Sequence, residues 1–402
     1  MTSAHTTTRT RDRLVAARTV MVLAAAVGVG RFVFTPILPL MHAQAGVSSA
    51  QGAALATSNY AGYLVGAIAA IAFPRLAHSP VAMKVSGVVV TVTVAGMGFT
   101  TSPAFWIVFR GLAGVASAFL FVIAVTAAIT AISSQSRHLA GWAYGGVGGG
   151  IVVSGVLVLI VSLLGGWREA WWVAGAVTAI LIIGGWQLID DAPHHRPAPL
   201  PARRGGRRVR GWFTALAASY FLEGAGYIIA GTFLVAAINA TAPAPLGKAA
   251  WIVVGVAAIP SCVLWGWLST RISHPTLLAV ALGLQAAGAA LGAIVDGPVP
   301  AVIAAVLFGG TFMGIATLTL AAGTHLQVPA AVAILSAVYA VGQAAGPVVV
   351  APLLGNGFHD ALLLAAILIA AAAAAAAIAR IRYPKASPRR LHTRFTQEGA
   401  RS

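Results

Sequence analysis

Three ionisable residues lie inside long apolar stretches of the chain: Arg31, Arg110 and Glu223. Such positions stand out, because 59% of the residues are hydrophobic and only 8% are charged. A charged side chain at the centre of a bilayer costs at least about 2.5–3.5 kcal/mol, and such residues in membrane proteins mark ion or substrate pathways. The three residues are therefore the first candidates for a functional site.

Glu223 is the only acidic residue that we expect deep in the membrane, about 18 Å along its apolar segment at 1.5 Å per residue. Burial disfavours the charged form of a carboxyl group, so Glu223 could bind and release a proton and couple that step to transport. Alternatively, Arg31 or a tyrosine holds it as a permanent carboxylate, or it contacts a substrate directly. Tyr220 and Tyr227 share its helix face and either line a cavity or satisfy Glu223.

Arg31 lies about 20 Å along the first apolar segment, with Gly28 three residues before it and Thr35 four residues after it. Its guanidinium suits a carboxylate or phosphate on a substrate, or it pairs with Glu223. Arg110 lies only about 10 Å from the end of its segment, where an arginine can also extend to the membrane surface.

Neutral polar residues add weaker candidates. Asn59 and Tyr63 share one face of the second apolar segment, and Gln285 and Gln343 lie near the middle of the ninth and eleventh segments. Such side chains form hydrogen bonds between membrane helices, or they line a cavity.

The elements that carry these residues are expected to be membrane-spanning helices, since the mean hydropathy is +0.90. About 20 apolar residues cross a bilayer, and every backbone polar group in it must be paired internally, as in helices or closed barrels. The apolar runs are continuous rather than alternating, which favours helices. The sequence contains twelve such segments, at approximately 18–42, 50–72, 81–100, 103–131, 139–164, 168–189, 211–238, 248–269, 275–295, 299–322, 331–355 and 359–380.

The basic residues predict the orientation of these helices. With both termini on one side, 21 of the 25 Lys and Arg residues fall on that side and two on the other. Basic loops face the cytoplasm, so both termini are expected there. The net charge of +17 then reflects topology and contact with anionic lipid rather than nucleic-acid binding.

The same pattern divides the chain into five parts. We expect a cytoplasmic tail at 1–17, a six-helix bundle at 18–189, a basic cytoplasmic linker at 190–210, a second six-helix bundle at 211–380 and a basic tail at 381–402.

The two bundles resemble each other at a nearly fixed offset. Gly28 and Gly30 match Gly224 and Gly226 at an offset of 196. Arg75 matches Arg271 at the same offset, and Gly145 and Gly149 match Gly342 and Gly346 at an offset of 197. Arg110 aligns with Gly310 at an offset of 200. Two parallel repeats of six helices, with a substrate site near the midplane between them, form the architecture of the major facilitator transporters.

The first segment carries a motif that resembles that of major facilitator antiporters: Gly30, five residues, then Pro36-x-x-Pro39. The longer string from Gly28 to Met41 resembles the YbfB/YjiJ group of this superfamily. Further strings similar to that group are Trp167-Arg168-x-Ala170-Trp171, Gly224-x-Gly226-Tyr227-Ile228, Gly309 to Gly314, and Gly342-Gln343-x-x-Gly346-Pro347.

The resemblance implies a single-chain secondary transporter of the bacterial inner membrane, with a substrate between its halves. It implies proton transfer for Arg110, and packing or gating roles for Gly28, Gly30, Pro36 and Pro39 in the first-segment motif. The Gly-x-x-x-Gly strings at Gly145 and Gly149 and at Gly342 and Gly346 predict helix packing first and a hinge second, and Pro347 predicts a bend. Two family motifs are incomplete, because Arg75 and Lys84 have no acid beside them and the fifth segment lacks its proline.

Other chemistry lacks support in the sequence. No phosphate-binding Gly-x-x-x-x-Gly-Lys loop and no His-Glu-x-x-His string occur, and Cys262 is the only cysteine. We therefore expect no enzyme, cofactor or metal site. The prediction is a monomeric, proton-coupled transporter of a small molecule. The alternatives are an uptake symporter for an organic anion, in place of an exporter or antiporter, and a membrane sensor that does not transport.

Overall fold

The computed structural model describes residues 2–131, 137–191, 207–241, 244–295, 297–328, 331–356, 358–381 and 383. Over these ranges the chain is helical and contains no β-strand. Eleven helices among the described residues are long and apolar enough to cross a membrane. The sixth spanning helix, α7 (Trp167–Gly185), completes a set of twelve, although Arg168 and Glu169 in its first turn make it more polar.

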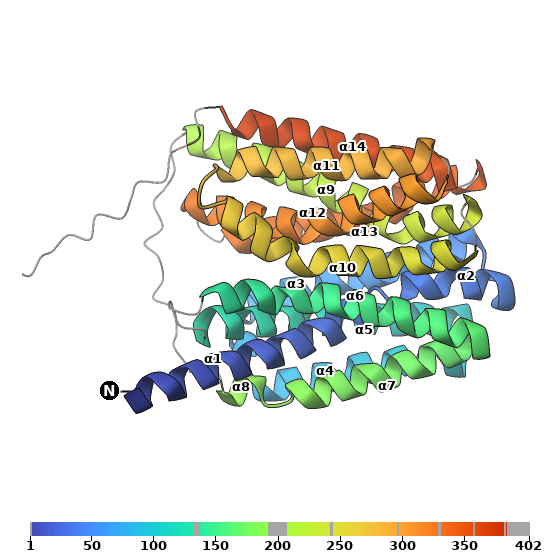
Figure 1. The fold of residues 1–402 in the computed structure, drawn as a ribbon, viewed down its shortest axis with the longest axis horizontal. Coiled ribbons are helices and arrows are strands. Elements are labelled where there is room, and N and C mark those ends of the chain that lie inside the picture. Colours follow the sequence, from blue (N-terminus) through green and yellow to red (C-terminus); the bar gives the residue numbers. More distant parts are fainter. Residues whose placement is uncertain are drawn as a thin grey trace, which may run out of the picture.

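The helices run side by side as two stacked halves, one from blue to green and one from yellow to red (Figure 1). The first half contains α1 (Thr2–Leu23), α2 (Phe34–Ala45), α3 (Ser49–Ala72), α4 (Pro80–Gly96), α5 (Pro103–Ala131), α6 (Arg137–Leu164), α7 and the short α8 (Leu188–Asp191). The second half contains α9 (Arg207–Thr241), α10 (Ala244–Leu268), α11 (His274–Ile294), α12 (Pro298–His325), α13 (Ala331–Val350) and α14 (Phe358–Ala379).

The helix ends lie close to the expected ones, because they follow proline, glycine and polar residues. The α3 helix begins at a capping box in which Ser48 and Gln51 satisfy each other's backbone N–H groups. The α5, α11 and α12 helices carry proline within their first two residues, where a missing N–H costs little. The predicted all-helical fold is confirmed.

The first spanning segment differs from its expected single helix. The α1 helix begins at Thr2, well before residue 18, and is followed by a wider, π-helical turn, η1 (Ala24–Val29). There, Gly30 N–H donates to Ala25 O at 2.8 Å and Phe32 N–H donates to Val27 O at 3.2 Å. The chain then passes through a turn at residues 30–33 into α2. The helix that carries Arg31 is therefore broken near its middle.

Glycines allow equivalent helices to touch in each half. A Cβ atom on Gly28 would lie 2.4 Å from Gly150 Cα, so the first spanning segment meets α6 backbone to backbone. In the second half, a Cβ on Gly224 would lie 2.5 Å from Tyr339 O, and one on Gly342 would lie 2.2 Å from Phe221 O, so α9 meets α13 in the same way. Small residues at such contacts are the usual means of close helix packing in membranes.

One glycine with a predicted packing or gating role, Gly149, does not lie at a helix contact. A Cβ on Gly149 would meet nothing within 4 Å, whereas one on its neighbour Gly148 would lie 2.7 Å from Ile259 N. Gly145 is also on this contact, at 3.1 Å from Ile259 O. The physical reason is the helix face: α6 packs against α1 and η1 through Gly146 and Gly150 and against α10 through Gly145 and Gly148, so Gly149 points between the two contacts.

The two halves meet through α6 and α10, α3 and α13, and α2 and α9. The α10 and α6 ribbons lie next to each other at the boundary in Figure 1. Pro36 lies in the first turn of α2, whereas Pro39 and Pro347 lie inside α2 and α13, where each removes a backbone hydrogen bond. A Cβ on Gly346 would lie 2.7 Å from Ala225 O, so this glycine packs α13 on α9.

One end of the bundle, which we call the basic end, carries Arg75, Lys84, Arg208 and Arg271 near or between helix ends, and Arg18 inside α1. The chain enters the bundle at this end, at the N label in Figure 1. Most of the predicted linker, residues 192–206, and most of the predicted C-terminal tail lie outside the described residues.

Candidate functional site

A cavity of about 90 Å³ lies between the two halves. It contains five of the predicted site residues: Arg31, Tyr63, Tyr220, Tyr227 and Gln343. The other described residues that line it are Val27, Phe32, Phe121, Phe312, Met313, Ala316, Leu320, Ser336 and Tyr339. Both halves contribute, so relative movement of the halves would change the shape of this cavity.

Arg31 lies on the cavity wall with its guanidinium among aromatic rings. Its Cζ atom is 4.1 Å from the centre of the Tyr63 ring and 5.1 Å from that of Tyr60. Its Nη2 donates to Gln343 Oε1 at 3.0 Å, across the interface between the halves. The side chain is 5% exposed, and its Nε has no hydrogen-bond partner. Arg31 therefore pairs with a neutral amide and not with Glu223.

Arg110 does not extend to the membrane surface, so that alternative is wrong. It is 1% exposed, and its guanidinium lies 4.7 Å from the centre of the Phe34 ring. It donates to Gly30 O at 3.4 Å and to Arg31 O at 3.3 Å. From the same helix, Ser117 Oγ donates to Ala26 O at 2.7 Å. The α5 helix thus supplies donors to carbonyl groups at the break in the first spanning segment.

Glu223 is 1% exposed and is not among the residues that line the cavity. When the Gln285 amide is oriented with its nitrogen toward Glu223, it donates to both carboxylate oxygens, at 3.1 and 3.0 Å. Gln285 comes from α11 and is fully buried. The predicted residues Glu223 and Gln285 therefore form a pair of their own, behind Tyr220 and Tyr227 on the cavity wall.

Two further predicted residues tie helices together. Asn59 Nδ2 donates to Arg110 O at 2.9 Å and links α3 to α5. Thr35 Oγ1 donates to Gly231 O at 3.2 Å and links α2 to α9 across the interface. Neither lines the cavity. Both make the interhelical hydrogen bonds that were the alternative to a cavity role for Asn59.

The sequence reasoning missed Tyr339. Its ring stacks on that of Tyr220, with 4.2 Å between ring centres and 13° between ring planes, and it lies 6.2 Å from that of Tyr227. The signal was available, because Tyr339 precedes Gln343 by one helical turn on α13 and so shares its face. Phe32, Phe312 and Phe121 were missed because apolar rings carry no polar signal in an apolar helix.

The cavity lies toward the basic end of the bundle. Ser336 is near the start of α13 and Leu320 is near the end of α12, and both helix ends are at the basic end. On the opposite side of the cavity, the rings of Phe32 and Trp251 lie 6.0 Å apart across the interface, and Thr35 binds Gly231. The halves therefore contact each other on the side of the cavity away from the basic end.

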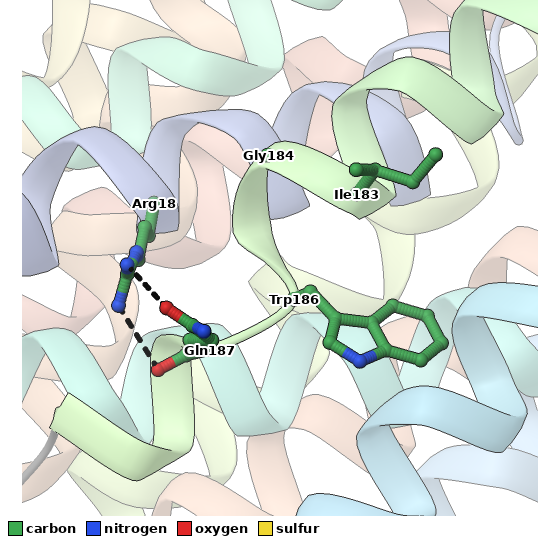
Figure 2. Close-up of a pocket in the computed structure, with 5 residues that line it drawn as sticks. All are labelled: Arg18, Ile183, Gly184, Trp186 and Gln187. Carbon is green, nitrogen blue, oxygen red and sulfur yellow. Dashed lines mark hydrogen bonds between the residues drawn. The ribbon is translucent and has the colours of Figure 1, made fainter.

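A second pocket, of about 430 Å³, lies at the basic end on the first half alone (Figure 2). Figure 2 shows Arg18 bound twice to Gln187, through the backbone oxygen at 3.3 Å and the side-chain Oε1 at 2.8 Å. Its lining residues come from α1 and from α7 and the turn after it. It is larger than the central cavity, but it is not between the halves. These bonds tie α1 to the end of the sixth spanning helix.

The sequence of this chain matches a known family of membrane proteins. Residues 23–380 match the family described as the uncharacterised MFS-type transporter YbfB. The chain belongs to this family. No curated protein sequence matches the chain significantly.

Solved structures of transporters share the fold. A mutant of the nucleoside transporter NupG superposes with a TM-score of 0.68 at 13% sequence identity, covering 91% of this chain and 100% of that one. A bacterial homologue of the human lysosomal transporter Spinster, in an inward-facing and unoccupied conformation, superposes with a TM-score of 0.66 at 14% identity, covering 92% of this chain and 96% of that one.

The family match and the helical fold establish a multi-pass transmembrane protein of the major facilitator superfamily. The members of this family are transporters, and the central cavity lies where such proteins place their substrate site. Among the described residues, no group of three His, Cys, Asp or Glu side chains could hold a metal ion.

Proposed function

We propose that this protein is a proton-coupled secondary transporter that moves a small molecule by alternating access between its two halves. Glu223 binds the coupling proton, and the central cavity binds the substrate. The protein acts as a monomer in the bacterial inner membrane, with both termini in the cytoplasm. With this orientation the cavity lies toward the cytoplasm.

The observation that carries the proposal is the pairing of Glu223 with Gln285. A carboxyl group held by an arginine would resist protonation, because protonation would leave the buried cation unpaired. The Gln285 amide is neutral, and by turning over it can donate to a carboxylate or accept from a carboxylic acid. Glu223 can therefore change its protonation state without breaking an ion pair.

Arg110 has a positioning role in this proposal. A guanidinium does not give up its proton in proteins, and this one is occupied by Gly30 O and Arg31 O. Through these bonds it holds the turn that carries Arg31 at the cavity. The geometry thus supports positioning over the proton transfer that the family resemblance implied for this residue.

The test uses purified protein in liposomes that contain a pH-sensitive dye. Amino acids, nucleosides, sugars and organic acids are added in turn, and the dye reports proton movement into the lumen. We expect one class to cause proton entry in the wild type and Glu223→Gln to abolish that entry. Exchange of labelled substrate across the membrane without net proton movement should survive in this variant.

The matched control is Glu169→Gln. Glu169 is an acidic residue at the end of the bundle opposite the basic end, where its side chain accepts a hydrogen bond from Gly166 N–H. This control should couple normally. Proton-driven transport that persists in Glu223→Gln would refute the coupling role. Ligand binding without any exchange of labelled substrate would instead support a sensor that does not transport.

One observation favours uptake of an organic anion over export. Arg31 is the only charged residue among the described residues that line the cavity, so the cavity carries a positive charge. An anion bound beside Arg31 would neutralise that charge, and the proton that enters with it would neutralise Glu223, so that both buried charges are compensated during uptake. The measured direction of substrate movement under an inward proton gradient decides between the two: accumulation in the lumen indicates symport, and loss from preloaded liposomes indicates antiport.

A further inference from the structure

The central cavity is polar at one place on its wall, which we call the polar pole, and mostly aromatic over the rest. Arg31 and Gln343 lie side by side, joined by their hydrogen bond of 3.0 Å. Apart from the tyrosines, Ser336 is the one further polar residue among the described residues that line the cavity. Seven of the fourteen lining residues are aromatic, against 8% of the whole chain. A ligand that fits this cavity is therefore polar at one end and apolar over most of its surface.

The polar pole is a cation that the described residues do not neutralise. Arg31 is more than nine-tenths buried, and its partners are the Gln343 amide and the rings of Tyr63, Tyr60 and Phe32. Rings stabilise a buried guanidinium only partly. Glu223, which could have neutralised it, is bound to Gln285. The unpartnered Nε of Arg31 leaves a donor for an anionic group, and a guanidinium binds a carboxylate through two parallel hydrogen bonds.

The walls present flat faces. The ring of Tyr227 is nearly parallel to that of Phe312, with 22° between planes and 5.4 Å between centres. Tyr220 and Tyr339 form a second parallel pair, at 13° and 4.2 Å. Phe32 meets Tyr227 edge to face, at 84°. Because the stacked faces cover each other, a ligand meets the edges and the remaining faces of these rings. Such surfaces bind another planar ring more favourably than they bind a bulky aliphatic group of the same area.

We propose that the substrate is a monovalent aromatic acid, with its carboxylate on Arg31 and its ring against the aromatic wall that the tyrosines and Phe312 form. This assignment rests on the proposed function only in taking the cavity as the transport site. It goes beyond that function in stating the charge, the number of charged groups and the shape of the substrate.

Binding to the wild-type protein gives the first test. Four probes are compared by isothermal titration calorimetry in detergent: benzoate, its neutral isostere benzamide, the non-planar cyclohexanecarboxylate and the dianion phthalate. We expect benzoate to bind about tenfold or more tightly than benzamide, because a charge-assisted hydrogen bond contributes about 1.5–3 kcal/mol. Cyclohexanecarboxylate and phthalate should bind more weakly than benzoate. Equal binding of benzoate and benzamide, or no binding of either, overturns the proposal.

Variants of Arg31 give the second test. Arg31→Gln should lower benzoate affinity by about tenfold or more while leaving benzamide affinity nearly unchanged, and Arg31→Lys should restore part of the difference. The control is Arg271→Gln, because Arg271 is an exposed arginine over the Trp267 ring at the basic end. If Arg31→Gln does not fold, the comparison of the four probes on the wild type still decides the matter.

The two proposals can fail separately. Benzoate binding that depends on Arg31, without proton-coupled flux of labelled benzoate in liposomes, would support the aromatic-acid site and refute the transport function. Proton-coupled flux of an uncharged compound, with no preference for benzoate, would do the reverse.

Discussion

The first and seventh spanning segments occupy equivalent places in the two halves, yet one is broken and the other is continuous. Residues 2–45 form two helices joined by the π-helical η1 and a turn, whereas α9 runs without interruption from Arg207 to Thr241. With the offset of 196, Tyr227 stands where the broken segment has Arg31, and Val27 stands where α9 has Glu223. Arg31 and Glu223 are therefore buried charges of opposite sign, on equivalent segments of the two halves but at different levels.

The difference shows what a broken membrane helix requires. Arg110 and Ser117 on α5 donate to Gly30, Arg31 and Ala26 at the break. In the second half, Gly310 stands over Arg110, and its own carbonyl accepts from Trp265 Nε1 at 2.8 Å. A glycine has no side chain to donate to a neighbouring break. The second half has no arginine at position 310 to donate to a break, and correspondingly its α9 helix is continuous.

The largest expected effect follows from removing the donor at the break. Arg110→Met leaves two carbonyl groups in the membrane without their donor, and we expect a loss of about 3–5 kcal/mol in the free energy of unfolding. Gly310→Ala, the control at the equivalent position, has open space for its methyl group and should lose little. Thermal unfolding of the detergent-solubilised protein measures both. Equal stability of the two variants would contradict the link between Arg110 and the break.

Glycine packing is the feature that both halves share. Gly28→Ala and Gly224→Ala each place a methyl group within 2.5 Å of backbone atoms, and we expect each to lose about 1–3 kcal/mol. Gly149→Ala is the control, because nothing lies within 4 Å of its added Cβ. The same unfolding measurement applies. If only one of the two packing variants loses stability, the helices inside the two halves are not packed by equivalent contacts.

The two glutamines separate the functions of the two charges. Gln343→Leu removes the partner of Arg31, and we expect a rise in KM for the transported substrate of about tenfold. Gln285→Leu removes the partner of Glu223, and we expect it to reduce proton-driven accumulation and leave the KM of substrate exchange unchanged. Initial rates in liposomes, with and without a pH gradient, distinguish the two. A common effect of both variants on KM would mean that Glu223 also binds substrate.

The smallest effect is expected at the stacked tyrosines. Tyr339→Leu removes the parallel contact with Tyr220, which is typically worth about 0.5–1.5 kcal/mol, and should weaken benzoate binding by roughly threefold to tenfold. Tyr339→Phe keeps the ring and loses only the hydroxyl group, so its benzoate affinity should stay close to that of the wild type. Calorimetry measures both. A larger loss in the Phe variant than in the Leu variant would show that the hydroxyl group matters and the stacking does not.

The fold was predictable because helix length and helix ends depend on local sequence. Runs of apolar residues of the right length, ended by proline, glycine or polar residues, predict membrane helices wherever they occur. The break in the first segment was not predictable in this way. It depends on donors from Arg110 and Ser117, which are about 80 to 90 residues away in sequence. The glycines at 28 and 30 permit such a break, but glycines at the equivalent positions of α9 do not produce one.

The candidate site was predictable in membership but not in arrangement. Depth along a helix follows from residue counting, so Arg31, Glu223, Gln285 and Gln343 could all be placed near the midplane. Which of them share a cavity depends on how each helix is rotated against its neighbours, and apolar surroundings on every side leave no periodic signal for that rotation. The structure pairs Arg31 with Gln343 and Glu223 with Gln285, and the sequence favoured neither pairing.

The hydrogen bond from Thr35 to Gly231 joins residues exactly one repeat apart, since 196 positions separate them. A contact between equivalent positions lies on the pseudo-twofold axis that relates the halves. The same bond lies on the side of the cavity away from the basic end, where the two halves contact each other. In the proposed cycle that side opens when the cavity closes toward the basic end, so this bond must break. One hydrogen bond between equivalent residues then holds both halves in the conformation that the structure shows.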